Sequence, residues 1–457
     1  MNWRLALAAA TLFPAFAGDL RVGRAAVKIT PPAGMPMAGY YYVRLNEGVH
    51  DDLYAKTVVL EKDGVNAAMV ALDMAGIPRR FVDAARAEIT KTTAIPGDRV
   101  MISATHSHTG PEMGSRLKGI GPKTQKIVDG YYAELPRRIA ESVRLAEADL
   151  QPARVRVARA HEESISFIRR YYMKDGTVGW NPGKNNPNIV APVGTIDPDV
   201  AIVLFESVAG KPLALYVNFA CHLDTVGGME FSADYAYALG RRIAEVKGDD
   251  VLTVFTIGAA GNINHIDVHN REPQKGHGEA ARIGTILAAD VFKAWPDLRP
   301  IEAGPPRVSA EMVKLPLATY DPAELERSKQ IVARFGKPNA DPFLQQVQAF
   351  KVVELAQRDG KPFEAEVQAI TLGNDLAWVG MPGEIFVEHG RALKSGSPFP
   401  FTILAELAND SLGYVPDRKA YPQGAYEVVS ARVGPGSGEL MVESAIRQLI
   451  ARGRVGK

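Results

Sequence analysis

The sequence of 457 residues has a single cysteine, no block of like charges and no low-complexity tract. Because Cys221 is the only cysteine, no intramolecular disulfide can form, and its apolar neighbours predict a small buried side chain rather than a nucleophile. The formal net charge of +1 argues against a strongly cationic surface, so we expect no nucleic-acid partner. With 46% hydrophobic and 23% charged residues, the composition is that of a soluble globular protein.

The N-terminus holds an apolar run, and no other stretch of the chain approaches transmembrane length. Residues 5–16 follow the positively charged Arg4, and residues 15–17 read Ala-Phe-Ala, a small-x-small pattern before a cleavage site near Gly18. This order is typical of a secretory signal peptide over residues 1–17, although a buried N-terminal helix is the alternative. We therefore expect a secreted or periplasmic protein whose mature chain is residues 18–457.

Hydrophobic periodicity predicts that strands alternate with helices. A hairpin is predicted where residues 55–61 and 66–72 flank a Lys-Asp-Gly turn. Helices are expected over residues 81–90, 131–148, 235–246, 279–292 and 441–451, and one more opens at Asp321-Pro322. Buried strands are expected over residues 100–104, 213–220, 251–257, 376–380 and 401–404. The pattern predicts an α/β fold with one large mixed sheet and flanking helices, and the polar segment 298–368 predicts an insertion or a subdomain boundary.

Polar side chains follow each of these five predicted strands, where ligands of α/β proteins gather. The residues concerned are His106 and His108, His222, a glycine-rich turn at 258–261, Glu384 and Tyr414. In an extended segment the two rings of a His-x-His pair lie on one face. Two imidazoles, one carboxylate and one phenolate satisfy a cation such as Zn²⁺. The sequence therefore predicts a metal site at the carboxyl ends of strands.

Each of these residues also has an ordinary structural explanation. The His-x-His pair can be two polar residues in a turn, and His222 can be a hydrogen-bonded core histidine. Glu384 can complement the dipole of a helix that begins near it, and Tyr414 can simply pack. Only the whole set favours a metal site over these alternatives.

Several blocks of the chain resemble the neutral/alkaline non-lysosomal ceramidase family. They are residues 22–32 (VGRAAVKITPP), 104–111 (ATHSHTGP), 382–384 (PGE) and 414–427. The resemblance covers almost the whole mature chain, and it implies the catalytic fold of that family over residues 18–457. We expect no C-terminal immunoglobulin-like domain, because the chain ends with the predicted helix.

The resemblance also implies a set of site residues. It implies that Zn²⁺ is bound by His106, His222, Glu384 and Tyr414. It further implies that His108 transfers a proton and that Arg169 and Tyr426 hold the developing oxyanion.

One position departs from the family. The family's Gly-Asp-Val-Ser-Pro segment reads Gly-Asn-Ile-Asn-His at residues 261–265, so that Asn264 stands where an active-site serine is expected. Because an amide cannot be deprotonated to a nucleophile, a serine alkoxide mechanism is excluded. We expect Asn264 to hydrogen-bond the substrate or to orient a water molecule.

The function that the resemblance implies is a zinc-dependent hydrolase. It would cleave the amide bond of an N-acylated, lipid-like substrate (ceramide or a related N-acyl amide) by a metal-activated water, with transient contact to a membrane surface. One alternative is a metallophosphoesterase-like or other ester hydrolase, for which Asp73, Asp234 and His265 are candidate residues. The other alternative is a non-catalytic, zinc-stabilised binding protein.

Overall fold

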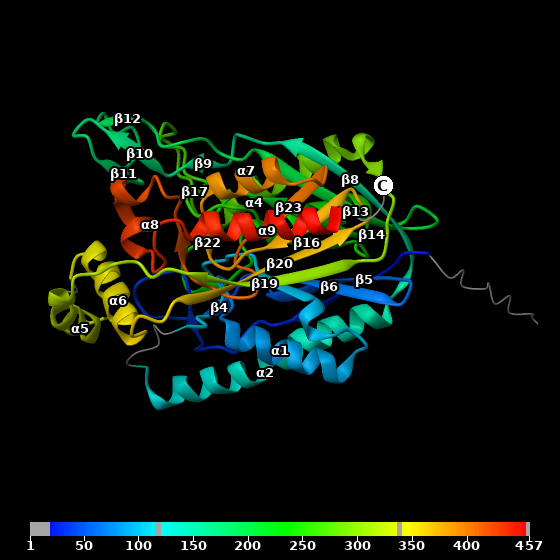
Figure 1. Ribbon diagram of the computed structural model, residues 1–457, viewed down its shortest axis with the longest axis horizontal. Helices are drawn as coiled ribbons and strands as arrows, with labels where there is room; N and C mark the ends of the chain where they lie inside the picture. The colour runs from blue at the N-terminus through cyan, green and yellow to red at the C-terminus, as the bar shows by residue number, and fades with distance from the viewer. Residues whose placement is uncertain (1–18, 115–119, 336–340, 454–457) are drawn as a thin grey trace, which may run out of the picture.

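The computed structural model describes residues 19–114, 120–335 and 341–453 (Figure 1). The predicted signal peptide over residues 1–17 lies outside the described residues. Within the described ranges, no helix is both long enough and apolar enough to cross a bilayer.

The core of the molecule is a nine-stranded mixed sheet in the order β16-β14-β13-β8-β1-β5-β6-β7, with β18 also paired to β8. Its strands are β1 (Arg21–Lys28), β5 (Tyr54–Lys62), β6 (Val65–Leu72), β7 (Val100–Ala104), β8 (Gln151–His161), β13 (Asp199–Ser207), β14 (Pro212–Phe219), β16 (Leu252–Ile257) and β18 (Arg299–Pro300). The pairs β6–β7 and β14–β16 are parallel, whereas β5 and β6 form the predicted antiparallel hairpin. The prediction of a large mixed sheet is confirmed.

A second sheet packs on one face of the first. It has the order β19-β20-β21-β23, with β19 (Arg307–Leu315), β20 (Phe363–Leu372), β21 (Leu376–Gly380) and β23 (Phe401–Ala405). Two of the predicted buried strands, β21 and β23, therefore belong to this sheet and not to the large one. Trp378 of β21 and Tyr216 of β14 meet between the sheets, with ring centroids 6.0 Å apart. Successive side chains of a strand point to opposite faces of its sheet. In β5, Val58 therefore packs in the core between the two sheets, and Val59 packs in the core between the large sheet and the helices.

Helices cover the two outer faces, so that the molecule has four layers (Figure 1). The large sheet carries α1 (Arg79–Thr92), α2 (Pro122–Ala148), α3 (Tyr235–Lys247) and α4 (His277–Lys293), and the second sheet carries α7 (Val387–Gly396) and α9 (Ser437–Gly453). The remaining helix of the C-terminal part is α8 (Ala425–Ser430), and short 3₁₀ turns are η1 (Gly97–Arg99), η2 (Trp295–Asp297) and η4 (Tyr421–Gln423).

The polar segment 298–368 contributes to the second sheet at both of its ends. It holds β19 and the first part of β20, and between them η3 (Pro322–Glu324), α5 (Leu325–Ala333) and α6 (Phe343–Gln357) form a helix pair at one end of the molecule (Figure 1). The predicted helix start is confirmed, because the Asp321 side chain accepts a hydrogen bond from the backbone of Ala323. The strand signal of β19 is weak because this strand lies at the edge of the sheet and many of its residues are partly exposed. That the segment is an inserted subdomain stays a prediction.

Short strands bring distant loops together at one end of the sheets. β9 (Phe167–Ile168) pairs with β17 (Ile263–Asn264), and β22 (Glu384–Ile385) pairs with β24 (Tyr414–Val415). The other short strands are β2 (Pro36–Met37), β3 (Arg44–Leu45), β4 (Gly48–Val49), β10 (Arg170–Met173), β11 (Val178–Trp180), β12 (Ile189–Pro192) and β15 (Glu230–Phe231).

Candidate metal centre and active site

The loop after β7 carries His106 in an unusual backbone conformation. Its φ of 76° lies in the left-handed region, which residues other than glycine seldom adopt unless their surroundings hold them there. The Nδ1 atom of His106 lies 2.7 Å from the carbonyl oxygen of Ala75. A ring nitrogen this close to a carbonyl oxygen carries a proton, so the Nε2 atom is the one that turns toward the site.

His222 follows β14 and is held in the same way. Its Nδ1 atom lies 2.9 Å from the carbonyl oxygen of Ala260, in the glycine-rich loop after β16. Burial lowers the pKa of His222 to about 4, and the neighbouring Arg169 adds to this effect. The imidazole is therefore neutral at neutral pH with its lone pair on Nε2, the state that a metal ligand requires.

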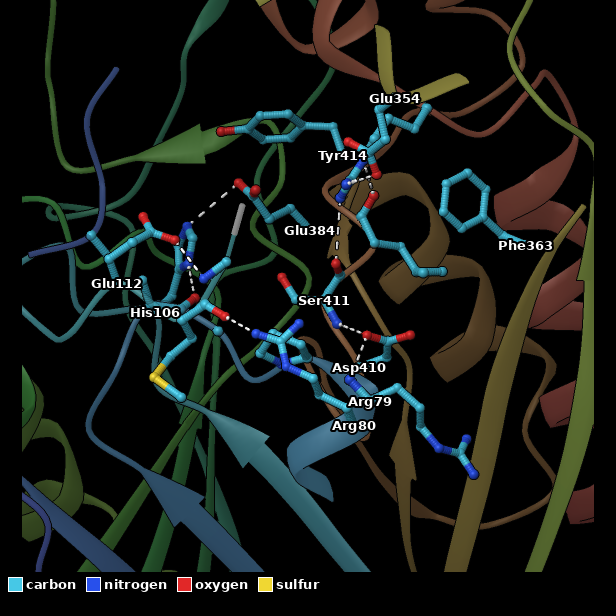
Figure 2. A pocket seen from close by; sticks show the side chains of 18 of the residues that line it. Arg79, Arg80, His106, Glu112, Glu354, Phe363, Glu384, Asp410, Ser411 and Tyr414 are labelled. Carbon is cyan, nitrogen blue, oxygen red and sulfur yellow. Dashed lines mark hydrogen bonds and ion pairs between the residues drawn. The ribbon is translucent and has the colours of Figure 1, made fainter. Parts of the chain in front are cut away.

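The Nε2 atoms of both histidines converge on the carboxylate of Glu384. Its Oε2 atom lies 3.4 Å from His106 Nε2 and 3.3 Å from His222 Nε2, and no described residue forms a hydrogen bond with this buried oxygen. The Nε2 atom of His108 lies 3.2 Å from that of His106. Figure 2 shows His106 and Glu384 facing each other across a narrow gap at one side of the cavity.

These donor atoms fit a bound cation. Lone pairs of two imidazoles and a carboxylate repel each other unless a positive charge lies among them. In the metal-free protein a proton can take that place: burial lowers the pKa of His106, but Glu384 raises it, and the net shift is upward. Ligand atoms of His106, His108 and His222 lie within 4.8 Å of one another in the described part of the chain. The triad could therefore hold a metal ion.

Tyr414 lies beside Glu384 because β22 and β24 pair in parallel with these two residues in register. The ring of Tyr414 also lies over the guanidinium of Arg169, which is 5.3 Å from the ring centroid. Burial raises the pKa of Tyr414 well above its ordinary value, which Arg169 partly offsets. All four predicted ligands are thus brought together, and His108 lies close enough to be a further donor.

Arg169 is a buried cation behind this site. Its Nε atom donates to Glu427 at 2.9 Å, and its guanidinium also contacts the carbonyl oxygen of Gly261 at 2.7 Å and His222 Nε2 at 3.3 Å. Burial lowers the pKa of Arg169, but Tyr414 and Glu427 raise it by more, so it keeps its charge. Glu427 is a residue that the sequence did not single out; no strand signal precedes it.

Glu406 is a second acid that sequence reasoning missed, although its place directly after β23 is the signal that could have revealed it. This fully buried carboxyl accepts hydrogen bonds from the backbone NH of Ala260 at 3.2 Å and of Ile385 at 2.6 Å. Burial, reinforced by Glu384, raises the pKa of Glu406 well above its ordinary value. Glu406 thereby connects the loop that orients His222 to the strand that carries Glu384.

Tyr426 and Asn264 occupy different surroundings. The ring of Tyr426 lies 5.3 Å from that of Tyr414 and faces the cavity. Asn264 is buried away from it, where its amide donates to Asn181 at 3.0 Å and its oxygen accepts from the backbone NH of Ile266 at 3.0 Å. Both groups of the Asn264 side chain are therefore committed to neighbouring loops.

A cavity of about 970 Å³ opens from the triad (Figure 2). The predicted site residues that line it are His106, His108, Glu384, Tyr414 and Tyr426. The predicted site residues that do not line it are His222, Arg169 and Asn264. The first group faces the space where a substrate can enter, whereas the second lies behind it.

The residues considered for a phosphoesterase have structural partners. Asp73 forms an ion pair with Lys56 at 3.1 Å, and Asp234 caps the start of α3. His265 lies 3.3 Å from Asp224. Cys221 is buried, and burial raises the pKa of its thiol well above the ordinary value, in agreement with the prediction that it is no nucleophile.

Comparisons with known proteins give a match in structure but not in sequence. No protein-family model matches the chain, and no curated protein sequence matches it significantly. The crystal structure of neutral ceramidase from Pseudomonas aeruginosa superposes with a TM-score of 0.74 at 20% identity, covering 95% of this chain and 75% of that one. A structure titled as a ceramidase complexed with C2 superposes with a TM-score of 0.70 at 19% identity, covering 96% and 76%. The chain therefore has the fold of neutral ceramidase, as the sequence resemblance implied.

Proposed function

We propose that the protein is a zinc-dependent hydrolase that cleaves the amide bond of an N-acylated, lipid-like small molecule. The observation that carries the proposal is the meeting of His106 Nε2, His222 Nε2 and Glu384 Oε2 at the side of a cavity. Support also comes from the fold, which is shared with a neutral ceramidase and with a ceramidase complexed with C2.

The donor set favours Zn²⁺ over harder cations. Imidazole nitrogens suit Zn²⁺, whereas Mg²⁺ and Ca²⁺ prefer sites made of oxygen alone. His106, His222 and Glu384 would hold the ion, with Tyr414 as the fourth donor. When bound, Zn²⁺ lowers the pKa of a water ligand from 15.7 to about 7 and polarises a carbonyl group.

The remaining residues of the site supply binding and proton transfer. His108 lines the cavity beside the ligands, where its Nε2 atom can receive a proton and deliver it to the leaving amine. Tyr426 presents its side chain to the same cavity and can contact the scissile group. Arg169 is buried behind Tyr414 with its guanidinium 5.3 Å from the ring centroid, so it acts through that residue as a fixed positive charge.

The test is hydrolysis of N-acyl amides with different head groups, with and without a chelator. We expect activity that a chelator abolishes and that zinc restores. His106→Ala should remove both metal and activity, whereas His161→Ala, at an exposed histidine of β8, should keep both. A protein that binds zinc but hydrolyses no N-acyl amide would support the binding-protein alternative instead, and hydrolysis of phosphate esters alone would support the phosphoesterase.

We also propose that the protein is exported. The order of charged, apolar and small residues in positions 1–17 supports this. Intact-mass measurement of protein from the periplasm or the medium should show the loss of these residues, and a full-length cytoplasmic product would contradict the proposal.

A further inference from the structure

The cavity walls carry charged side chains that the chemistry at the triad does not use. Two of the lining cations are neutralised: Arg79 forms an ion pair with Glu366 at 2.7 Å, and Arg432 forms one with Glu354 at 2.5 Å. A third, Lys314, lies directly opposite Glu364 in the register of β19 and β20. These cations are therefore matched by acids in or near the cavity.

Three further lining cations have no carboxylate within ion-pair distance among the described residues and, unlike Lys314, no acid opposite them in a strand pair. They are Arg80 at the start of α1, and Arg358 and Lys361 in the turn between α6 and β20. The lining acids that form no ion pair with a described residue are Glu112, Asp410 and Glu364, and the last of these lies opposite Lys314. Burial raises the pKa of Asp410, and this carboxyl already accepts the backbone NH of Arg79 at 2.9 Å. The unpaired charge of the walls is thus positive, with most of it in one turn.

Arg358 is held in place before any ligand arrives. Its Nε atom donates to the carbonyl oxygen of Lys361 at 3.1 Å, and its Nη2 atom donates to that of Pro362 at 2.9 Å. The guanidinium also stacks over the ring of Phe363, 3.6 Å from its centroid. These contacts fix the plane of the guanidinium, and no described residue accepts a hydrogen bond from its Nη1 atom. Little entropy is therefore lost when an oxyanion binds there.

This turn lies at the far end of the cavity from the metal ligands. Figure 2 draws Phe363 and Glu354 on the opposite side from His106 and Glu112. A substrate whose amide lies at His106 would therefore extend toward Arg358 and Lys361. An uncharged alkyl chain in this position would remove water from the partly buried Arg358 without replacing its water contacts, which is unfavourable.

We propose that Arg358 and Lys361 bind an anionic group of the substrate, so that the substrate is an N-acyl amide with a carboxylate or a phosphate at the end remote from the scissile bond. The inference rests on the proposed amide hydrolysis and narrows its substrate class. Charge-assisted contacts to a partly enclosed oxyanion favour it by about ten-fold or more over a neutral group of the same shape.

The experiment compares anionic amides with neutral partners of equal size. The pairs are 8-acetamidooctanoic acid and 8-acetamidooctanamide, 8-acetamidooctyl phosphate and 8-acetamidooctanol, and 8-(methylamino)-8-oxooctanoic acid and its primary amide, in all of which a long chain separates the variable group from the scissile amide. The first two place a carboxylate or a phosphate on the amine portion, and the third places a carboxylate on the acyl portion. We expect the anionic member of at least one pair to have a kcat/KM about ten-fold higher, mainly through KM.

Two variants locate the effect. Lys361→Glu should collapse the anionic-to-neutral ratio of kcat/KM, and Lys126→Glu, an equal charge change at an exposed position of α2 outside the cavity, should keep it. High salt should lower the wild-type ratio, because it screens exposed charges. Hydrolysis with no anionic preference in any pair, or a preference that Lys361→Glu leaves intact, would overturn the inference.

The failure of the proposed function can be recognised separately. If the zinc-loaded protein hydrolyses no amide, the affinity of the same compounds, measured by calorimetry, tests the anion site without reference to catalysis. Tighter binding of an anionic member to the wild type than to Lys361→Glu would support it, and equal or absent binding would overturn it.

Discussion

At the scale of single residues, the chemistry of the site depends on which ring nitrogen of each histidine carries the proton. In His106 and His222 the Nδ1 atom is taken up by a backbone carbonyl oxygen, at Ala75 and Ala260. Nε2 is thereby left to face Glu384 in both residues. These backbone contacts would orient the proposed ligands without touching an ion. Contacts of this kind typically account for 10- to 100-fold in metal affinity.

The role of His108 can be separated from that of the ligands by one substitution. We expect His108→Ala to keep a stoichiometric metal ion, because His106, His222 and Glu384 remain, and to lower kcat by about 10²- to 10⁴-fold through lost proton transfer. Elemental analysis and steady-state kinetics measure the two effects. His106→Ala is the matched comparison, since it should lose the metal; loss of metal from His108→Ala would make His108 a ligand instead.

Glu406 offers a second prediction at this scale. Its raised pKa and its two accepted backbone hydrogen bonds indicate a neutral group that acts as an acceptor. Glu406→Gln keeps an acceptor oxygen and should retain metal affinity within a few-fold. Glu406→Ala leaves the NH groups of Ala260 and Ile385 unpaired, at about 1–3 kcal/mol each, and should weaken metal binding by at least about ten-fold. Competition with a chromophoric chelator measures the zinc affinity of each variant. Equal affinities of Glu406→Gln and Glu406→Ala would contradict the proposed role of Glu406 as a hydrogen-bond acceptor.

At the scale of elements, two-residue strands make the site. The pairing of β22 with β24 brings Glu384 beside Tyr414, although thirty positions of chain separate them. The pairing of β17 with β9 likewise places Gly261 and Asn262 next to Arg169, whose backbone NH donates to the carbonyl oxygen of Asn262 at 3.1 Å. Each of these strands is too short to give a periodic signal in the sequence.

Helix α4 contains a buried acid whose ionisation should limit stability. The pKa of Asp290 is raised from 3.8 to about 6 by burial and by its contact with Glu162. An acid with a raised pKa stabilises the fold fully below its unfolded pKa, and this contribution is lost as the pH rises through about 6. Asp290→Asn should therefore be more stable than the wild type at pH 8, by about 1–2 kcal/mol, and lose this advantage near pH 4.

Urea unfolding at several pH values measures this difference. Asp297→Asn, at an exposed position just after α4, changes the same charge without burial and should show no such pH dependence. An Asp290→Asn variant with equal or lower stability than the wild type at pH 8 would contradict the burial argument.

At the scale of the whole molecule, the proposed metal ligands come from both sheets. His106 and His222 follow β7 and β14 of the large sheet, whereas Glu384 follows β21 of the second sheet. An ion bound among them cross-links the two sheets, which otherwise meet through apolar contacts such as Tyr216 with Trp378. Metal binding is therefore expected to stabilise the packing of the sheets against each other.

Removal of the metal should lower thermal stability. At a free metal concentration 100-fold above Kd, binding contributes about 2.7 kcal/mol to the free energy of unfolding. We expect a chelator to lower Tm, zinc to restore it, and the His222→Ala variant to respond to neither. Calorimetry of chelated and reloaded protein is the measurement, and a Tm that is independent of zinc in the wild type would argue against a bound ion at this site.

The sequence by itself determined the elements of the central sheet and the candidate ligands. The hairpin of β5 and β6, the strands β7, β14 and β16, and the helices α1 to α4 have long apolar periods, because each buries one face in a large core. His106, His222, Glu384 and Tyr414 could be selected because each comes after a predicted buried strand and because the family resemblance implies the same four ligands.

Only the tertiary structure decided what depends on contacts between distant segments. The structure places β21 and β23 in a second sheet. An apolar run in the sequence predicts a buried strand, but it does not predict which sheet the strand joins. The structure revealed Glu406 and Glu427, whose partners are backbone NH groups and arginines far away in sequence. The structure also shows that Asn264 does not line the cavity and that charged side chains do. The direction of a side chain depends on tertiary packing, and a local sequence pattern does not predict it.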